Sequence, residues 1–102
     1  MFLTVEGVEG AGKSTRLAAL ADGLEAEGKV VLRTREPGGS LLGTQIRPLL
    51  LRADHKPDPN AELFLFLADR AQHVAEVIRP ALAAGTQVLC DRYADSTIAN
   101  QV

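Results

Sequence analysis

The nine residues GVEGAGKST, from Gly7 to Thr15, decide how this chain folds. Three glycines in this stretch favour neither a helix nor a strand. A short apolar run, Phe2 to Glu6, comes before the glycines, and an amphipathic segment follows them. A strand that passes through a glycine loop directly into a helix is the first half of a βαβ unit.

The same stretch matches G-x-x-x-x-G-K-[ST], the phosphate-binding template called the P-loop. Glycines let several backbone N–H groups turn toward one anion, and the start of the helix adds the positive end of its dipole. Lys13 offers a catalytic cation for the β- and γ-phosphates, and Ser14 offers a hydroxyl ligand for Mg²⁺. We therefore predict a site for ATP with Mg²⁺, formed by Gly7, Val8, Glu9, Gly10, Ala11, Gly12, Lys13, Ser14 and Thr15. The alternative is a glycine-rich turn without a ligand.

Two further apolar runs predict strands at Lys29–Thr34 and Thr86–Asp91. Because all three runs are apolar on both faces, they are typical of a parallel sheet covered by helices on each side. The helix after the P-loop carries its apolar residues at helical spacing and is expected to end near Gly28: Leu17, Leu20, Ala21 and Leu24. The fold class is therefore α/β, a three-layer P-loop NTPase arrangement.

The second half of the chain is expected to be mostly helical. One helix is predicted from about Leu41 to Leu51, with Pro48 bending or shortening it. The next is expected to be capped by Asp58 or Asn60 and disturbed at its end by Pro80. Its apolar stripe is predicted as Leu63, Phe66, Leu67, Arg70, Ala71, Val74, Val77 and Ile78.

The pattern after the third strand starts another helix near Asp95 or Ser96 and then stops. Three strands are few for a doubly wound sheet, and at least one edge would remain unpaired. We therefore expect residues 1–102 to be the N-terminal part of a single larger domain, with a complete small domain as the alternative.

Composition narrows the possible functions. The formal net charge is −2, which gives no general electrostatic reason to expect a nucleic-acid polymer or a membrane surface as partner. No apolar run approaches the roughly 20 residues of a membrane span. A single cysteine, Cys90, allows no intrachain disulfide and suits a reducing compartment, so a cytoplasmic protein is expected.

Three arginines are predicted at the carboxyl ends of strands or on the helix that faces those ends: Arg35, Arg70 and Arg92. The planar fork of donors in arginine fits phosphate oxygens, so these residues predict a second anionic substrate beside ATP. The D-x-x-G and N-K-x-D motifs of a GTPase do not occur in this sequence.

Four blocks in this order, EGVEGAGKST, TREPGGS, LFLFLADRAQHV and LCDRYADSTIANQ, resemble thymidylate kinase of the bacterial type over nearly all of the sequence. The resemblance implies ATP-dependent phosphorylation of dTMP to dTDP. It also implies a five-stranded parallel core, a homodimer, and chains about twice this long.

The resemblance gives roles to residues outside the P-loop template. It implies that Phe66 stacks on thymine, that Arg70 reaches the nucleotide and that Arg92 holds the dTMP phosphate during catalysis. Glu9 would contact the sugar of dTMP, and Arg35 would begin a substrate-side loop shaped by its neighbours. Ser96, Thr97 and Gln101 would line the base.

Asp91 follows an apolar strand and is expected to assist Mg²⁺, usually through water. Asp69 is expected to be structural.

Two positions differ from the family pattern. Asn100 stands where the family commonly has an aromatic residue, which puts the stacking contact at this position in question. Gly10 follows Glu9 where some members have arginine, and the resemblance implies that such variants take their catalytic arginine from a later lid.

The predicted function is therefore phosphorylation of dTMP, with these 102 residues an incomplete and inactive portion of the enzyme. Two alternatives stay open: a non-catalytic nucleotide-binding fragment, and a P-loop kinase for another nucleoside monophosphate.

Overall fold

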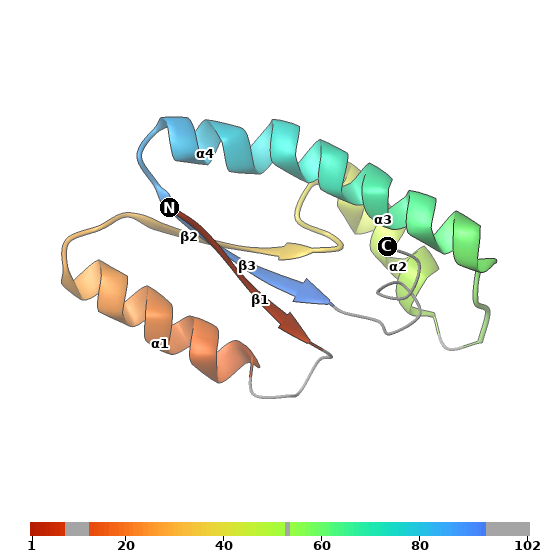
Figure 1. Ribbon diagram of the computed structural model, residues 1–102, viewed down its shortest axis with the longest axis horizontal. Helices are drawn as coiled ribbons and strands as arrows, with labels where there is room; N and C mark the ends of the chain where they lie inside the picture. The colour runs from red at the N-terminus through yellow and green to blue at the C-terminus, as the bar shows by residue number, and fades with distance from the viewer. Residues whose placement is uncertain (8–12, 53, 94–102) are drawn as a thin grey trace.

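A computed structural model describes residues 1–7, 13–52 and 54–93 of the chain. The described residues form a parallel sheet of strands β1 (Phe2–Gly7), β3 (Gln87–Tyr93) and β2 (Val31–Glu36), in the order β1-β3-β2. Helix α1 (Lys13–Ala26) covers one face. The opposite face is covered by the helical run of α3 (Pro59–His73), the π-helical turn η1 (Val74–Ile78) and α4 (Arg79–Ala83), and α2 (Leu41–Leu51) packs against α3 (Figure 1). The predicted three-layer α/β arrangement is confirmed.

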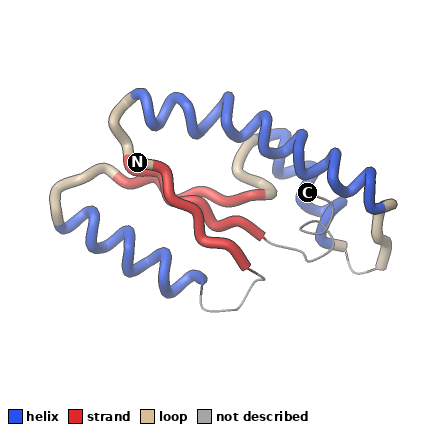
Figure 2. Tube along the Cα trace, in the orientation of Figure 1, coloured by secondary structure: helices blue, strands red, loops and turns tan. Residues whose placement is uncertain are grey.

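The central strand β3 forms the core of the sheet. Val88, Leu89 and Cys90 are completely buried, because helices pack on both faces of this strand. On the α1 side, Leu17 and Ala21 pack against Leu89. Figure 2 shows the strands lying between α1 and the long helical run on the other side.

Two strands extend two residues further than their sequence predicts, and this difference matters for the site. β2 continues past Thr34 to Glu36, and β3 continues past Asp91 to Tyr93. Glu36 and Arg92 are register partners in these extensions and form an ion pair there. Because each charge has a partner on the neighbouring strand, polar residues can continue a sheet that an apolar pattern alone would end.

Pro48 and Pro80 affect their helices differently. Helix α2 keeps the predicted bounds and runs through Pro48, since Ile46 and Leu50 on either side are buried and hold it in place. Near Pro80 the helix changes form, and the N–H of Arg79 reaches the carbonyl of Val74, five residues back. Pro80 has no N–H to donate, which accounts for the predicted disturbance here.

The predicted apolar stripe is confirmed only in part, because Ile78 is buried and four members are half-buried, namely Leu63, Phe66, Val74 and Val77, but Leu67, Arg70 and Ala71 are exposed. The buried side chains of α3 are polar, namely Glu62, Asp69 and His73, whereas Leu67 is 49% exposed. The physical reason is that the buried side of α3 meets the end of β2 and the loop after it, where the carboxylate of Glu36 and the N–H of Gly38 need hydrogen-bond partners. Asp58 caps this helix as predicted, by accepting a hydrogen bond from the N–H of Asn60.

Candidate functional site at the carboxyl ends of the strands

The P-loop residues lie largely outside the described part of the chain. Val8 to Gly12 and the predicted base-lining residues Ser96, Thr97 and Gln101 are not among the described residues, and neither is Asn100. What the structure does describe is the setting: β1 ends at Gly7 and α1 begins at Lys13. Thr15 is exposed in the first turn of α1. The predicted strand-to-helix context of the loop is therefore confirmed.

Glu36 joins two of the three predicted arginines. Its carboxylate oxygen Oε1 accepts hydrogen bonds from the Nε atoms of Arg70 and Arg92, each at 3.1 Å. Arg70 comes from α3 and Arg92 from β3, so two distant parts of the chain meet at one buried carboxylate. The structure therefore brings Arg70 and Arg92 together at the carboxyl end of the sheet.

The sheet register explains why this pair forms. Arg92 on the central strand is the register partner of Glu36 on one side and of Glu6 on the other. Its Nη1 atom lies 3.2 Å from Oε1 of Glu6, so two carboxylates flank this guanidinium group. Alternation along a strand places these three side chains on one face of the sheet, the face that α3 covers.

The other oxygen of Glu36 is fixed by His73. Nδ1 of His73 lies 2.7 Å from Oε2 of Glu36 and donates its proton to that carboxylate. Nε2 lies 2.6 Å from the hydroxyl of Thr34, and both Glu36 and His73 are buried. Burial alone would raise the pKa of Glu36, but the hydrogen bonds from His73 and Arg70 and the charges of both arginines outweigh it and lower the pKa below its ordinary value. Glu36 is therefore a carboxylate at neutral pH.

The loop from Pro37 to Ser40 is fastened to the helices around it. Oδ1 of Asp69 accepts a hydrogen bond from the N–H of Gly38 at 2.9 Å, and the side chain of Arg47 donates to the carbonyl of Pro37 at 2.7 Å. The pKa of Asp69 is raised above its ordinary value, mainly because the carboxyl group is buried. The hydrogen bond from Gly38 lowers this pKa but does not outweigh the effect of burial. The hydroxyl of Ser40 caps α2 by accepting from the N–H of Gly43. Asp69 thus has the structural role that the sequence predicts, since it holds the loop that follows Glu36.

At two positions in this region, only glycine fits, because there is no room for a Cβ atom. A Cβ atom at Gly39 would overlap the carbonyl oxygen of Arg35 and the ring of His73, and one at Gly43 would overlap Oδ1 of Asp69. The loop and α2 therefore approach α3 more closely than any residue with a side chain would permit.

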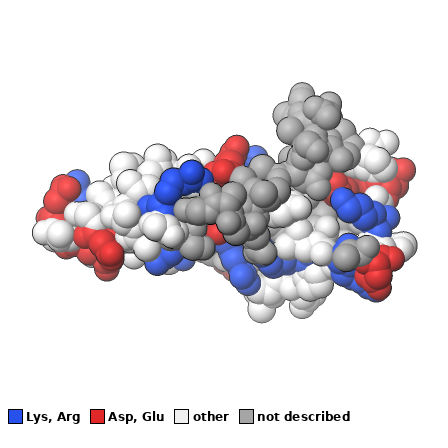
Figure 3. All heavy atoms as spheres, turned by 90° about the horizontal axis from the view of Figure 1, so that it is seen from below, with Lys and Arg blue, Asp and Glu red and all other residues white. Residues whose placement is uncertain are grey.

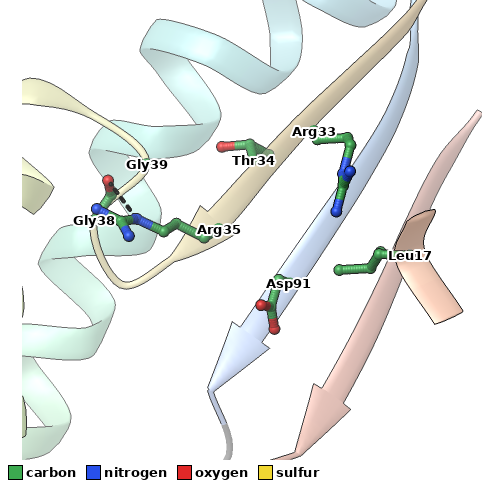
Figure 4. A pocket seen from close by; sticks show the side chains of 7 residues that line it. All are labelled: Leu17, Arg33, Thr34, Arg35, Gly38, Gly39 and Asp91. Atoms are coloured by element: carbon green, nitrogen blue, oxygen red, sulfur yellow. Dashed lines mark hydrogen bonds between the residues drawn. The ribbon is translucent and has the colours of Figure 1, made fainter. Parts of the chain in front are cut away.

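Arg35 lies apart from the Glu36 cluster. Its Nε atom is 3.5 Å from the carbonyl oxygen of Gly38, and its side chain lines a pocket of about 390 Å³ (Figure 4). Asp91 from β3 and Leu17 from α1 line the same pocket. Leu17 is one turn after Lys13, so this pocket borders the start of the P-loop helix. The three arginines thus divide into a pair on the α3 side and a single residue beside Asp91.

Phe66 and Arg70 lie one turn apart on α3, as their spacing predicts. Phe66 is half-buried and Arg70 is exposed, with 48% of its side chain accessible. The phenyl ring therefore keeps part of its surface free while its neighbour is tied to Glu36.

Sequence reasoning missed the importance of Glu36 and His73. Glu36 was expected only as one of the neighbours of Arg35 that shape the loop, and His73 had no assigned role. A signal was present, since Asp69 and His73 lie four positions apart and therefore share one side of the helix. Polar residues that recur on one side of an apolar helix indicate a buried polar contact.

Glu36, His73 and Cys90 each offer a possible metal ligand atom, and these atoms lie within 4.8 Å of one another. The chemistry of the cluster does not fit a cation. Two guanidinium groups already bind Glu36, and both ring nitrogens of His73 have partners. Burial and the neighbouring charge of Glu36 raise the pKa of Cys90 to about 12, so this side chain remains a thiol.

Charged side chains on the α1 side of the molecule are mixed in sign. Figure 3 shows lysines and arginines interspersed with acidic residues over the described part of this face. Among the described residues, no helix combines the length and apolar character needed to cross a membrane.

Comparison with known proteins assigns the chain to a family. The sequence model of the thymidylate kinase family matches residues 5–102. The chain belongs to the thymidylate kinase family. It is 63% identical over 102 residues to a thymidylate kinase of Solidesulfovibrio magneticus, and 56% identical over 101 residues to one of Gloeobacter violaceus.

The structure agrees with this assignment. A crystal structure of thymidylate kinase from Ehrlichia chaffeensis matches with a TM-score of 0.81 and 43% identity, over 99% of this chain and 58% of that one. The two relatives named above are covered over 49% and 48% of their length, against 99% of this chain in each case. The chain therefore spans about half the length of the curated relatives it matches.

Proposed function

We propose that residues 1–102 form the N-terminal part of a kinase domain that transfers a phosphoryl group from ATP to dTMP and yields dTDP. The observation that carries this proposal is the family membership, combined with the pairing of Arg70 and Arg92 at the carboxyl ends of the strands. In open α/β folds, this is the edge at which ligands bind.

The donor side of the site is assigned to the P-loop. Backbone N–H groups of residues 7–15 would hold the phosphates of ATP, and Lys13 would stabilise the charge of the transferred group. Mg²⁺ prefers oxygen ligands, and Ser14 and Asp91 offer a hydroxyl and a carboxylate. Asp91 lines the pocket beside Leu17 in α1, which supports its position near the start of the P-loop helix. Bound Mg²⁺ would neutralise phosphate charge there.

The acceptor side is assigned to the arginine pair and its surroundings. Arg92 and Arg70 would bind the phosphate of dTMP, and Phe66 would stack on the base one turn away from Arg70. Arg35 lies within β2 and does not begin the loop as predicted, but its side chain reaches Gly38 in that loop, and it is assigned to the substrate side. Four residues outside the described part of the chain complete the assignment: Glu9, Ser96, Thr97 and Gln101.

Such a site acts mainly by position and charge. Phosphoryl transfer needs the attacking oxygen in line with the leaving group and cations around the transferred group, and it requires no covalent intermediate on the protein. The arginines would hold the acceptor phosphate while Lys13 compensates charge on the donor.

The test is a coupled ADP-release assay in a full-length protein that carries these 102 residues. We expect turnover with dTMP to exceed turnover with dUMP, CMP or GMP, and Lys13→Ala to remove nearly all of it. Arg92→Ala should weaken dTMP binding more than ATP binding, whereas the surface variant Arg79→Ala should leave both unchanged. Higher turnover with another monophosphate would show that dTMP is not the substrate. An equal loss of affinity for dTMP and ATP in Arg92→Ala would contradict the acceptor role of Arg92.

Residues 1–102 alone are expected to release little or no ADP with dTMP, because they span about half of the relatives. We also propose a homodimer in the cytoplasm for the full-length protein. Sedimentation equilibrium would measure the assembly, and a monomer at micromolar concentration would contradict it.

A further inference from the structure

We infer that Glu36 is a positioning residue for the acceptor phosphate, because it holds the Arg70 and Arg92 side chains by their Nε atoms and leaves terminal guanidinium nitrogens directed to one anion. This inference rests on the proposed function and adds a residue to it that touches no substrate.

The first step is the way in which each arginine is held. Both hydrogen bonds to Oε1 of Glu36 come from Nε, at 3.1 Å. The two Nε atoms therefore lie within twice that distance of each other. A guanidinium group is a rigid planar fork, so fixing Nε limits the directions in which its Nη atoms can point.

The second step concerns which donors remain. Arg92 uses Nη1 in its contact with Glu6, and among the described residues Nη2 of Arg92 and both Nη atoms of Arg70 make no hydrogen bond. Arg70 is 48% exposed and Arg92 is 20% exposed, so these donors can be reached from solvent. Two forks held at one carboxylate are suited to the several oxygens of a single phosphate.

The third step is that Glu36 itself is held firmly. It is 3% exposed, and His73 and Thr34 form a hydrogen-bonded chain behind it with distances of 2.7 and 2.6 Å. Its backbone is paired with Arg92 in the sheet. The carboxylate is therefore fixed by the strand on one side and by α3 on the other, and it transfers this rigidity to the arginines.

If Glu36 had only an electrostatic role, its replacement would have the opposite effect on phosphate binding. If Glu36 only lowered the positive charge of the cluster, its neutralisation would leave two arginines with more net charge and would strengthen the binding of an anion. If Glu36 positions the arginines, the same change lets them separate by mutual repulsion and weakens the binding of phosphate.

The experiment compares Glu36→Gln with the wild type in a full-length protein that carries these residues. We expect kcat with dTMP to fall about tenfold or more and the Kd for dTMP to rise at least about fivefold, whereas KM for ATP changes less than about twofold. Glu62→Gln is the matched control, because Glu62 is also a buried glutamate of 4% exposure, and it should keep wild-type kinetics.

A second variant preserves the charge. Glu36→Asp retracts the carboxylate by one carbon–carbon bond, about 1.5 Å, so it cannot reach both arginines as Glu36 does. We expect a loss of turnover similar to that of Glu36→Gln. If Glu36→Gln fails to fold, Glu36→Asp alone decides, and wild-type kcat in this variant would overturn the inference.

A spectroscopic measurement separates this inference from the proposed function. In ¹⁵N NMR spectra, the Nε–H signals of Arg70 and Arg92 should be displaced in the wild type and return toward those of free arginine in Glu36→Gln. If the wild type does not phosphorylate dTMP, the proposed function fails, and binding of inorganic phosphate becomes the deciding probe. Tighter or unchanged phosphate binding in Glu36→Gln, or unchanged Nε–H signals, would overturn the positioning role.

Discussion

Replacing Gly39 by alanine tests how closely the loop after β2 must approach α3. The new Cβ would overlap the carbonyl oxygen of Arg35, which belongs to strand β2, and would lie 2.6 Å from Cδ2 of His73. The strand backbone is paired with β3 and cannot move easily, so the ring of His73 must yield. His73 would then lose its contacts with Thr34 and Glu36.

The magnitude follows from these losses. Overpacking costs at least about 1 kcal/mol. Losing a hydrogen bond to a neutral group costs about 1 kcal/mol, and losing one to a charged group about 1.5 kcal/mol or more. With overpacking and the charged hydrogen bond at the lower end of their ranges and the neutral hydrogen bond at its central value, the free energy of unfolding of Gly39→Ala should fall by about 3.5 kcal/mol.

Urea denaturation followed by circular dichroism measures this change. Gly23→Ala is the matched control, because Gly23 lies inside α1 and a Cβ there meets no atom within 4 Å. That variant should gain about 0.5 to 1 kcal/mol from helix propensity. A loss below about 1 kcal/mol in Gly39→Ala would refute the close approach on which this reasoning depends.

Three further predictions concern pH, thiol chemistry and helix capping. Because the pKa of Glu36 is lowered from its ordinary 4.5, its contribution to stability is complete above about pH 4.5 and is lost as the pH falls below it. Urea denaturation between pH 6 and 3 should therefore show a steeper loss in the wild type than in Glu36→Gln, and equal slopes would contradict the lowered pKa. Cys90, with a pKa raised to about 12 and a buried side chain, should react with Ellman's reagent at pH 8 only after unfolding in guanidinium chloride, so rapid native reaction would contradict its burial. Asp58→Ala should reduce the free energy of unfolding by about 1 kcal/mol through loss of the α3 cap, whereas Asp54→Ala, at an exposed ion pair, should have little effect.

The layers of the fold could be predicted because they depend on local patterns. The glycine stretch, the apolar runs and the N-terminal cap of α3 are each encoded within a few neighbouring residues. The order β1-β3-β2 could not be read in the same way, since it depends on which strands pair across long separations in the chain. The ends of β2 and β3 were predicted too short because an apolar pattern does not register a cross-strand ion pair such as Glu36–Arg92.

The candidate site divides in the same manner. The donor loop is a continuous motif, so its residues could be named from the sequence. The acceptor cluster combines contacts between residues 34, 37 and 56 positions apart, all of which meet at Glu36. The helical spacing placed Arg70 on a predicted apolar stripe. In the structure, the buried side chains of α3 are the polar residues Glu62, Asp69 and His73. Glu36 could not be identified from a motif, because its proposed role is only to hold the side chains of Arg70 and Arg92.

The alternation of side chains along β2 accounts for the separation of the arginines. Neighbouring residues of a strand point to opposite faces, so Arg35 and Glu36 cannot both face α3. Glu36 takes the α3 face and with it Arg70 and Arg92, and Arg35 is left beside Asp91 and Leu17. A shift of one residue in the register of β2 would exchange these positions and place a third guanidinium group against the pair instead of the carboxylate that joins them. The geometry proposed for the acceptor phosphate therefore depends on the register of β2, the strand in which Glu36 is itself the buried residue.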